Sequence, residues 1–346
     1  MTFLLERFPN LDLEHASLGL FPTPIEPIVD MVEGASLWCK REDLSGEMYG
    51  GNKVRKLEWL LPEARLRGDT VMSLGATGSN HLLATALHGE SVGLNLQALV
   101  VPQPVTEHVR DNARILQHHA ARVWPCRSRM VVPWVGWQAW KHCRDVCQGE
   151  PTWIPAGGSS ALGTLGWVEA GLEIADQVEQ GCLPLPTDVF VPFGSGGTAA
   201  GLWVGLSLAG LPTRVHAVRV MDWPYVRRAT LTSLAGATVR LLRARGAVLA
   251  HPGADTLIVD STAIGGGYGH PTSEGMEAVE KAREVAGLLL EPTYSAKALA
   301  ACIRAIVEGR TGGEVLFVDT LNSRSLTGLL EACPPLSGES MGGLLA

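Results

Sequence analysis

Short apolar runs alternate with longer amphipathic stretches along most of this chain. The apolar runs predict strands at residues 71–74, 96–101, 122–124, 188–193, 214–220 and 314–318. The stretches between them predict helices that begin near residue 79, cover residues 106–119, and run through Leu202 and Leu206. Such alternation of strand and helix predicts an α/β fold, with mostly parallel sheets and helices on their faces.

The region from residue 125 to 158 interrupts this pattern and supports no confident assignment of elements. It contains several prolines and glycines and four tryptophans, Trp134, Trp137, Trp140 and Trp153. Packing in a core or at an interface is favoured for these aromatic rings over a substrate-binding wall.

Composition limits the class of protein. The chain has 346 residues, enough for two domains, with 46% hydrophobic and 18% charged residues, as in globular proteins. A net charge of -7 and the absence of a nucleic-acid-binding motif argue against a nucleic-acid partner. The first residues lack the basic and apolar segments of a signal peptide, and no apolar run approaches the roughly 20 residues of a membrane span. A cytoplasmic protein without a membrane partner is expected.

Seven dispersed cysteines fit free thiols in a reducing cytoplasm: Cys39, Cys126, Cys143, Cys147, Cys182, Cys302 and Cys333. His142, Cys143 and Cys147 are spaced closely enough to suggest a metal site, but no second ligand pair completes a tetrahedron. Two small buried thiols one helical turn apart are the favoured interpretation. No metal is predicted.

Two glycine-bearing loops follow predicted strands, where α/β folds bind ligands. The loop made of Gly194, Ser195, Gly196, Gly197 and Thr198 precedes a helix, so its backbone N–H groups and hydroxyls can surround one anion. It lacks the lysine of a P-loop and the glycine spacing of a dinucleotide site, and its length suits a monophosphate. An ordinary tight turn is the alternative.

The other loop, residues 75–81, ends in Ser79, Asn80 and His81 at the start of a helix. A serine that caps the helix, with polar neighbours, explains this segment without any function. The functional interpretation places the Asn80 amide on a phenolic oxygen and the Ser79 hydroxyl near a substrate carboxylate or a migrating proton. Gly75 and Gly78 would allow the backbone to approach a ligand closely.

Lys53 and two tyrosines complete the set of candidate residues. Lys53 follows two glycines and Asn52 at the mouth of a predicted helix. It is either an ordinary solvated charge or the amine that holds an aldehyde cofactor, pyridoxal phosphate (PLP), as a Schiff base. Tyr268 and Tyr294 lie on or beside predicted loops, where they either pack or relay protons.

These segments, in this order, resemble the PLP-dependent family that contains 1-aminocyclopropane-1-carboxylate (ACC) deaminase and D-cysteine desulfhydrase, of the tryptophan-synthase-β group (fold type II). The resemblance covers residues 21–326 and is most specific at residues 50–58, 79–81 and 194–198 and at Tyr294 with Lys297. It implies a larger PLP-binding domain (residues 1–55 and 165–346), a smaller α/β domain (residues 56–164), the cofactor in the cleft between them, and a homodimer.

The resemblance also implies roles for single residues. Lys53, beside Asn52, would hold the cofactor and transfer the proton, and Asn80 would bind the cofactor 3′ oxygen. The loop 194–198 would bind the phosphate. Ser79 would contact the substrate carboxylate or act as a nucleophile, next to the substrate-binding residues Asn80 and His81. Tyr268 and Tyr294 would flank the reacting carbon.

Ser295 distinguishes between members of the family. ACC deaminases carry a glutamate after the tyrosine, facing the pyridine nitrogen, whereas D-cysteine desulfhydrases carry a hydroxyl residue. Without a carboxylate the pyridine is a weaker electron sink, which suits prompt loss of a β leaving group better than ring opening of ACC. Ser295 is alternatively a helix N-cap. Three departures from the family pattern, at Gly78, at Leu83 and at residues 319–322, put the substrate in question.

The resemblance therefore predicts a PLP-dependent lyase that eliminates a β substituent from a small amino acid to give a 2-oxo acid and ammonia, with the D-enantiomer among the candidate substrates. Four alternatives stay open: ACC deamination, β-replacement, a non-catalytic paralogue, and a phosphate-binding α/β protein without PLP.

Overall fold

The computed structural model describes residues 2–222, 224, 226–336 and 341–345. The chain forms two compact units. The first contains residues 1–13, 19–56 and 159–323, and the second contains residues 14–18, 57–158 and 324–346. Residues 324–346, which the sequence left with the larger domain, join the second unit because α11 packs on α4.

A six-stranded sheet organises the first unit, in the strand order β1-β2-β10-β7-β8-β9. Only β1 runs antiparallel to its neighbour, and the other pairs are parallel. The strands are β1 (Ile25–Pro27), β2 (Leu37–Arg41), β7 (Asp188–Phe193), β8 (Arg214–Arg219), β9 (Leu257–Asp260) and β10 (Val315–Asp319). The helices of this unit are α1 (Phe3–Arg7), α6 (Leu165–Glu179), α7 (Gly197–Leu208), α8 (Arg228–Ala244), α9 (Ser273–Ala286) and α10 (Ser295–Val307).

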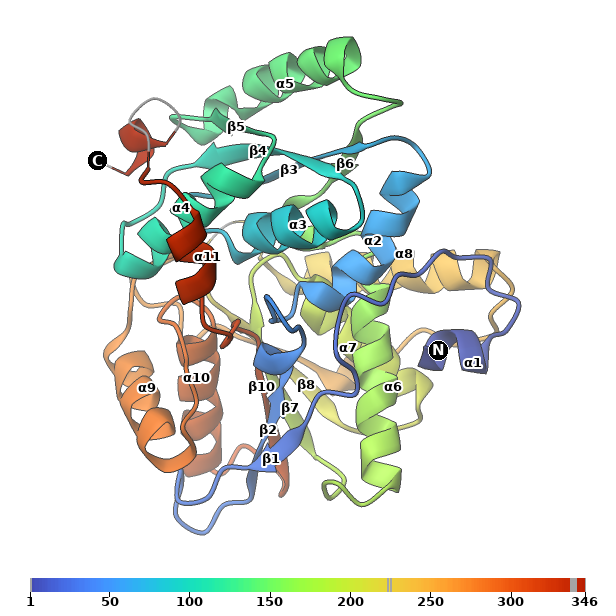
Figure 1. Cartoon of the computed structure of the whole chain (residues 1–346). Helices are drawn as coiled ribbons and strands as arrows, with labels where there is room; N and C mark the ends of the chain where they lie inside the picture. Colours follow the sequence, from blue (N-terminus) through green and yellow to red (C-terminus); the bar gives the residue numbers. More distant parts are fainter. Residues whose placement is uncertain (1, 223, 225, 337–340, 346) are drawn as a thin grey trace. The chain divides into compact units, whose positions relative to one another are not determined.

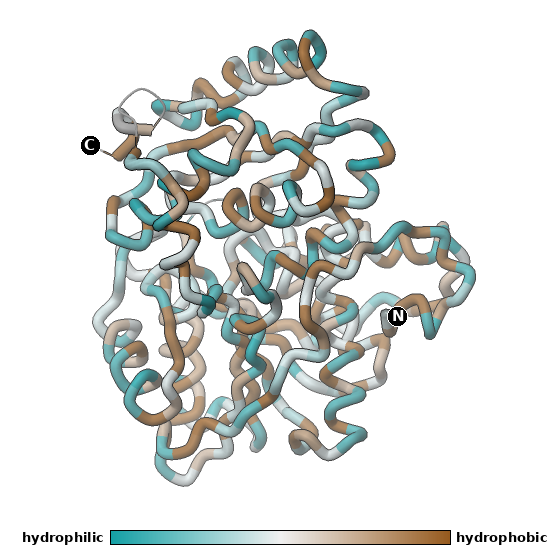
Figure 2. The backbone as a smooth tube through the Cα atoms, viewed as in Figure 1, coloured by the Kyte–Doolittle hydropathy of each residue, from teal (hydrophilic) through white to brown (hydrophobic). Residues whose placement is uncertain are grey.

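Both faces of this sheet are covered. Every residue of β7 and β10 is buried, and because successive side chains of a strand point to opposite faces, each face must be packed. Helices α9 and α10 pack on one face, where Phe190 and Phe317 join their apolar side chains, and α6 and α7 lie on the other (Figure 1). In Figure 2 the strands are largely brown, whereas α9 carries teal turns on its outer side.

The second unit is built on a four-stranded parallel sheet in the order β5-β4-β3-β6. Its strands are β3 (Thr70–Ala76), β4 (Asn95–Val101), β5 (Arg122–Pro125) and β6 (Thr152–Ile154). Its helices are α3 (Asn80–Ser91), α4 (Glu107–His119), α5 (Val132–Val146) and α11 (Thr327–Ala332). Helix α2 (Val54–Arg65) begins in the first unit and continues into the second. Short 3-10 turns are η1 (Glu42–Leu44), η2 (Arg129–Val131), η3 (Ala156–Gly158), η4 (Ala254–Thr256) and η5 (Gly342–Leu344).

The predicted α/β fold with two mostly parallel sheets flanked by helices is confirmed, but the region 125–158 needs a correction. It contains α5 and β6, and Ala139 and Cys143 of α5 pack against the sheet. Packing in the core is wrong for its four tryptophans, because 60% of Trp134 is exposed and Trp137, Trp140 and Trp153 are exposed as well. Cys143 is buried as expected, whereas Cys147 follows the helix and is half-buried.

Candidate active site

Lys53 lies directly before α2, on a turn that Gly51 forms with a φ of 89°, a conformation that favours glycine. Its Nζ donates a hydrogen bond to Asn52 Oδ1 at 2.7 Å. The Nδ2 of Asn52 in turn donates to Thr198 Oγ1 at 3.0 Å. The Asn52 amide therefore connects the candidate lysine to the glycine loop, although the two segments are more than 140 positions apart in the sequence.

The surroundings of Lys53 raise the fraction of its amine that is neutral near pH 7. Burial lowers the pKa of its amine to about 8, and the Glu291 carboxylate opposes part of that effect. At this pKa about 10% of the amine is neutral at pH 7, compared with ~0.04% for an ordinary lysine. A neutral lysine amine is a nucleophile and a base, so Lys53 is suited to both roles.

The glycine loop joins β7 to α7. Gly196 precedes α7 with a φ of 95°, which turns the chain into the helix. The hydroxyl of Ser159 completes the loop, because it lies 2.8 Å from Ser195 Oγ and accepts a hydrogen bond from Gly197 N at 3.0 Å. A Cβ on Gly197 would stand 2.6 Å from Ser159 Oγ and 2.9 Å from Lys56 Nζ. The loop thus forms a narrow polar cradle at a helix N-terminus, as an anion site requires.

The two candidate tyrosines lie together in the first unit. Tyr294 OH donates to Tyr268 OH at 3.1 Å, and the rings meet edge to face with centroids 5.8 Å apart. A Cβ on Gly194 would lie 3.1 Å from the Tyr294 ring, so the ring also borders the glycine loop. Lys297 fixes the Tyr268 loop, since its Nζ donates to the Ile264 and Gly267 carbonyls at 2.8 and 2.9 Å.

Glu291 connects the tyrosines with Lys53. Its carboxylate accepts hydrogen bonds from the backbone N–H groups of Thr293, Tyr294 and Ser295 and so caps α10. The interpretation of Ser295 as the N-cap is therefore wrong. Ser295 is the first residue of α10, and its buried Oγ accepts a hydrogen bond from Glu291 N at 2.9 Å. Because the same Glu291 charge acts on the Lys53 amine, these groups share one electrostatic environment.

The second unit holds the other three candidates. Ser79 caps α3, where its Oγ accepts a hydrogen bond from Leu82 N at 3.2 Å. Asn80 is oriented by α4: its Oδ1 accepts from Asn112 Nδ2 at 2.8 Å and lies 3.2 Å from His108 Nε2.

His81 is buried within the second unit. Its Nε2 lies 3.0 Å from Ser73 Oγ on β3, and that hydroxyl also donates to the Ile154 carbonyl at 2.8 Å. The predicted substrate contact of His81 stays a prediction, and the contact that the structure gives this ring is structural.

Comparison with known proteins identifies the chemistry. The family model described as pyridoxal-phosphate dependent enzyme matches residues 16–320. The chain belongs to this family. It is 34% identical over 327 residues to a D-cysteine desulfhydrase from Salmonella newport (strain SL254), which covers 91% of this chain and 94% of that protein. A D-cysteine desulfhydrase from Salmonella schwarzengrund (strain CVM19633) is 35% identical over the same length.

Solved structures agree with this membership. A crystal structure described as an ACC deaminase homologue aligns with a TM-score of 0.79 and 29% identity, covering 95% of this chain and 97% of that one. A fungal L-serine ammonia-lyase from Rhizomucor miehei aligns over 91% of this chain and 98% of that one, with a TM-score of 0.60. At 18% identity it supports the fold alone. The predicted PLP-dependent enzyme of fold type II is confirmed.

The first unit fits the PLP phosphate through a residue that the sequence analysis missed. Lys56 is fully buried beside the glycine loop, and its Nζ donates to Ser159 Oγ at 3.3 Å. Burial and the neighbouring Lys53 ammonium lower the pKa of the Lys56 amine well below its usual value. A phosphate in the cradle would supply negative charge to this lysine. The sequence did contain a signal for this residue: Lys56 follows Lys53 by three positions at the start of a predicted helix, and residues at that spacing lie on the same face of a helix.

Other contributors could not be inferred from local sequence. Three of them contact candidate residues that are distant in the sequence: Ser159 contacts the glycine loop, and Asn112 and His108 contact Asn80. The capping role of Glu291 can be recognised only once α10 is known to begin at Ser295.

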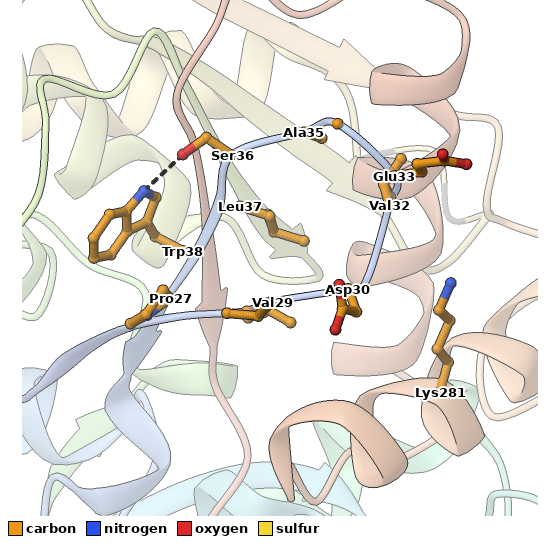
Figure 3. A pocket seen from close by; sticks show the side chains of 12 residues that line it. Pro27, Val29, Asp30, Val32, Glu33, Ala35, Ser36, Leu37, Trp38 and Lys281 are labelled. Atoms are coloured by element: carbon orange, nitrogen blue, oxygen red, sulfur yellow. Dashed lines mark hydrogen bonds between the residues drawn. The ribbon is translucent and has the colours of Figure 1, made fainter.

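A surface cavity of about 430 Å³ in the first unit lies elsewhere (Figure 3). It is lined by residues 27–30 and 32–38 and by Lys281, and it includes no candidate residue. Trp38, on β2, donates from Nε1 to Ser36 Oγ at this cavity. Because no candidate residue lines the cavity, the cavity is given no part in the PLP chemistry.

Gly197→Ala tests the phosphate cradle. The added Cβ has to displace Ser159 Oγ and Lys56 Nζ, two side-chain atoms that can move without unfolding the protein. We expect the affinity for PLP to fall about 10- to 100-fold, the value of one or two hydrogen bonds to a charged group, when PLP binding to the apoenzyme is measured by fluorescence. Gly328→Ala, with nothing within 4 Å of its Cβ, is the matched control. Equal affinity of the two variants would contradict the assignment.

The lowered pKa of Lys53 predicts how cofactor uptake depends on pH. Only the neutral amine attacks the PLP aldehyde, so the rate of apoenzyme reconstitution should rise about tenfold from pH 7 to 9 and level off above pH 8 to 9. An ordinary lysine would give a rise of about 100-fold without a plateau in this interval. Stopped-flow absorbance at several pH values distinguishes the two.

Proposed function

We propose that this protein is a PLP-dependent lyase that converts D-cysteine, or a similarly small amino acid with a β leaving group, to a 2-oxo acid and ammonia. For D-cysteine the balanced reaction consumes one water and gives pyruvate, ammonia and hydrogen sulfide. The observation that carries the proposal is the hydrogen-bonded connection from Lys53 through Asn52 to Thr198, with the Lys53 pKa near 8. Similarity to D-cysteine desulfhydrases over most of both chains supports the choice of substrate.

Bound PLP supplies an electron sink for the charge left on the substrate α-carbon. Lys53 would hold the cofactor, and its Nζ would take the α-proton of the substrate. Asn52 orients that amine, and residues 194–198, with Lys56, bind the phosphate. Tyr294 OH donates a hydrogen bond to Tyr268 OH at 3.1 Å, and this pair of hydroxyls is assigned the protonation of the departing sulfur.

In the second unit, Asn80 is assigned to the cofactor 3′ oxygen. Its amide oxygen already receives hydrogen bonds from α4, which fixes the side-chain orientation. Ser79 is assigned to the substrate carboxylate or to nucleophilic attack. Its Oγ accepts the capping hydrogen bond, and a hydroxyl that accepts can also donate. His81 is assigned to the substrate side of the same helix start.

Ser295 supports elimination over ACC ring opening. A neutral hydroxyl at the pyridine nitrogen would leave the ring unprotonated, which would suffice where a thiolate leaves promptly but not where a cyclopropane must open. The nearby Glu291 carboxylate is engaged by three backbone N–H groups of α10. The proposal therefore assigns the pyridine contact to Ser295.

Pyruvate formation tests the proposal. The purified holoenzyme is incubated with D-cysteine, L-cysteine, β-chloro-D-alanine and ACC, and the 2-oxo acid is quantified. Pyruvate from D-cysteine and β-chloro-D-alanine, with little from L-cysteine, is the expected result. Absence of pyruvate from both D-amino acids would sink the desulfhydrase assignment.

ACC deamination is the second candidate, because the ACC deaminase homologue aligns over nearly the full chain at 29% identity. It predicts 2-oxobutanoate from ACC, and a gain of that activity in Ser295→Glu.

The proposal includes a cytoplasmic homodimer. All seven cysteines are free thiols, which supports a reducing compartment. Trp134 and Trp137 stack at 5.2 Å on the exposed side of α5, and exposed aromatic residues are common at interfaces. No helix among the described residues is long and apolar enough to cross a membrane. Light scattering of the wild type and of Trp134→Ser tests the dimer.

A further inference from the structure

Three side chains with metal-ligating atoms meet in the second unit, in a part of the molecule that the proposed chemistry does not use. His118 and His119 end α4, and Cys333 directly follows α11, which lies beside α4 (Figure 1). One ring nitrogen of each histidine and the Cys333 sulfur all lie within 4.8 Å of one another. This cluster was not among the sequence-based candidates, because Cys333 lies more than 200 positions from the two histidines.

His119 is oriented as a metal-binding histidine is. Its Nδ1 lies 2.7 Å from Glu90 Oε2 on α3, so Nδ1 carries the proton and Nε2 presents a lone pair. Nε2 is shielded from solvent and has no hydrogen-bond partner among the described residues. A shielded acceptor without a partner is costly, and a cation would satisfy it. A carboxylate on one ring nitrogen with the metal on the other is the usual outer-shell arrangement of zinc-bound histidines.

Cys333 is held in place by α4. Its side chain is buried, and its backbone carbonyl accepts a hydrogen bond from the Arg114 guanidinium, which also donates to the Pro334 carbonyl at 3.1 Å. The His118 and His119 rings lie almost perpendicular, with centroids 5.0 Å apart. Contacts outside the cluster therefore hold the backbone at Cys333 and the His119 ring, and the side chain of His118 is exposed, where a change of rotamer is possible.

We propose that His118, His119 and Cys333 bind one borderline divalent cation of the Zn²⁺ class. Two imidazoles and a thiol suit zinc, whereas Ca²⁺ and Mg²⁺ require oxygen ligands. Zinc–ligand distances imply ligand atoms roughly 3.3–3.6 Å apart in a tetrahedron, so side-chain shifts of about 1 Å complete the site. On binding, the S–H bond breaks, the sulfur–metal bond forms, and the proton passes to solvent. A water takes the fourth position.

Such a site would secure α11 and the residues directly after it, Cys333 and Pro334, to α4. It joins the end of α11 to the end of α4 through coordinate bonds, in addition to the Arg114 hydrogen bonds. Metal binding would therefore also stabilise the second unit, because a ligand that binds only the folded state shifts unfolding by mass action.

The test titrates Zn²⁺ into the full-length holoenzyme, stripped with a chelator and without substrate, because D-cysteine itself binds zinc. We expect one Zn²⁺ per chain with a dissociation constant at or below the micromolar range. Calorimetry in buffers of different ionisation enthalpy should report about one proton released per metal. Binding below one equivalent, or without proton release, would overturn the proposal.

Variants locate the site. His118→Ala changes an exposed side chain, so this variant should fold normally. We expect Zn²⁺ binding to weaken at least tenfold in each of three variants: His118→Ala, His119→Ala and Cys333→Ser. Glu90→Gln should weaken it about 10-fold through His119. Cys182→Ser, an exposed thiol of the first unit, and His142→Ala, in α5, are matched controls that should bind as the wild type does. Unchanged affinity in His118→Ala and Cys333→Ser would overturn the assignment.

Discussion

Lys53→Ala is expected to lower kcat/KM for D-cysteine by at least about 10³-fold. The substitution removes both the amine that holds PLP and the base that takes the α-proton, and a positioned base alone contributes about 10²- to 10⁴-fold. Among the described residues no other buried lysine is an equivalent replacement, because Lys40 donates to Glu173, Lys56 donates to Ser159 beside the phosphate cradle, and Lys297 donates to two loop carbonyls. Steady-state pyruvate formation measures the loss.

Lys281→Ala is the matched control for this experiment. Lys281 is an exposed lysine of α9 in the same unit, and it lines the surface cavity, which no candidate residue lines (Figure 3). It should retain wild-type activity. If Lys53→Ala kept more than a tenth of the wild-type rate at saturating PLP, the central assignment would be wrong.

Glu173→Gln is expected to destabilise the protein by about 3–5 kcal/mol. Glu173 lies in a buried ionic network where Arg55 Nη2 reaches its Oε1 at 2.8 Å and Lys40 Nζ donates to the same oxygen. Arg55 also donates to Glu42 at 2.7 Å, so it anchors the first turn of α2, next to Lys53. Removing the Glu173 carboxylate leaves the buried cations Arg55 and Lys40 without enough negative charge around them. Breaking a buried ion pair by removing one partner is strongly destabilising, because the remaining charge is buried and uncompensated.

The effect of Glu173 should depend on pH in a defined direction. Burial favours its protonated form, but the Arg55 and Lys40 charges outweigh burial and hold the pKa of Glu173 at about 2. A carboxyl whose folded pKa is lowered stabilises the protein above its unfolded pKa, near 4.3, and loses that contribution as the pH falls toward 2. Urea unfolding should therefore show the full penalty of Glu173→Gln at pH 7 and a smaller one at pH 3. A penalty that grows on acidification would contradict this account.

Local sequence was sufficient for β3, β4, β5, β7, β8 and β10 and for the glycine loops that follow β3 and β7, whereas β1, β2, β6 and β9 were not predicted. The apolar run at residues 188–193, the glycines after it and the helix beyond predicted β7, the loop and α7, because each depends on neighbouring residues. The extended run at residues 71–74 and the polar Ser79 likewise predicted β3 and a capped α3. Such elements follow from hydrophobic periodicity and capping alone.

Features that depend on tertiary contacts were out of reach. Helix α5 was missed because its exposed face carries Trp134, Trp137 and Trp140 where polar residues are usual, which obscures the amphipathic pattern. Ser295 was interpreted as a possible N-cap, but the first N–H groups of α10 donate to the Glu291 carboxylate. This carboxylate lies four residues earlier and is a stronger acceptor than a hydroxyl.

The same limit applied to the candidate site. The bridge from Asn52 to Thr198 and the contact of Ser159 with the glycine loop join positions far apart in the chain, so only the folded structure brings them together.

The most direct test of the central claim locates the cofactor on the chain. The holoenzyme is reduced with borohydride, which converts the C=N bond between PLP and its lysine to a stable amine, and is then digested and analysed by mass spectrometry. The account predicts the cofactor mass on the peptide that carries Lys53, with the modification on that residue. Modification of Lys40, Lys56 or Lys297 instead, the other buried lysines with lowered pKa values in the first unit, or of no lysine, would contradict it.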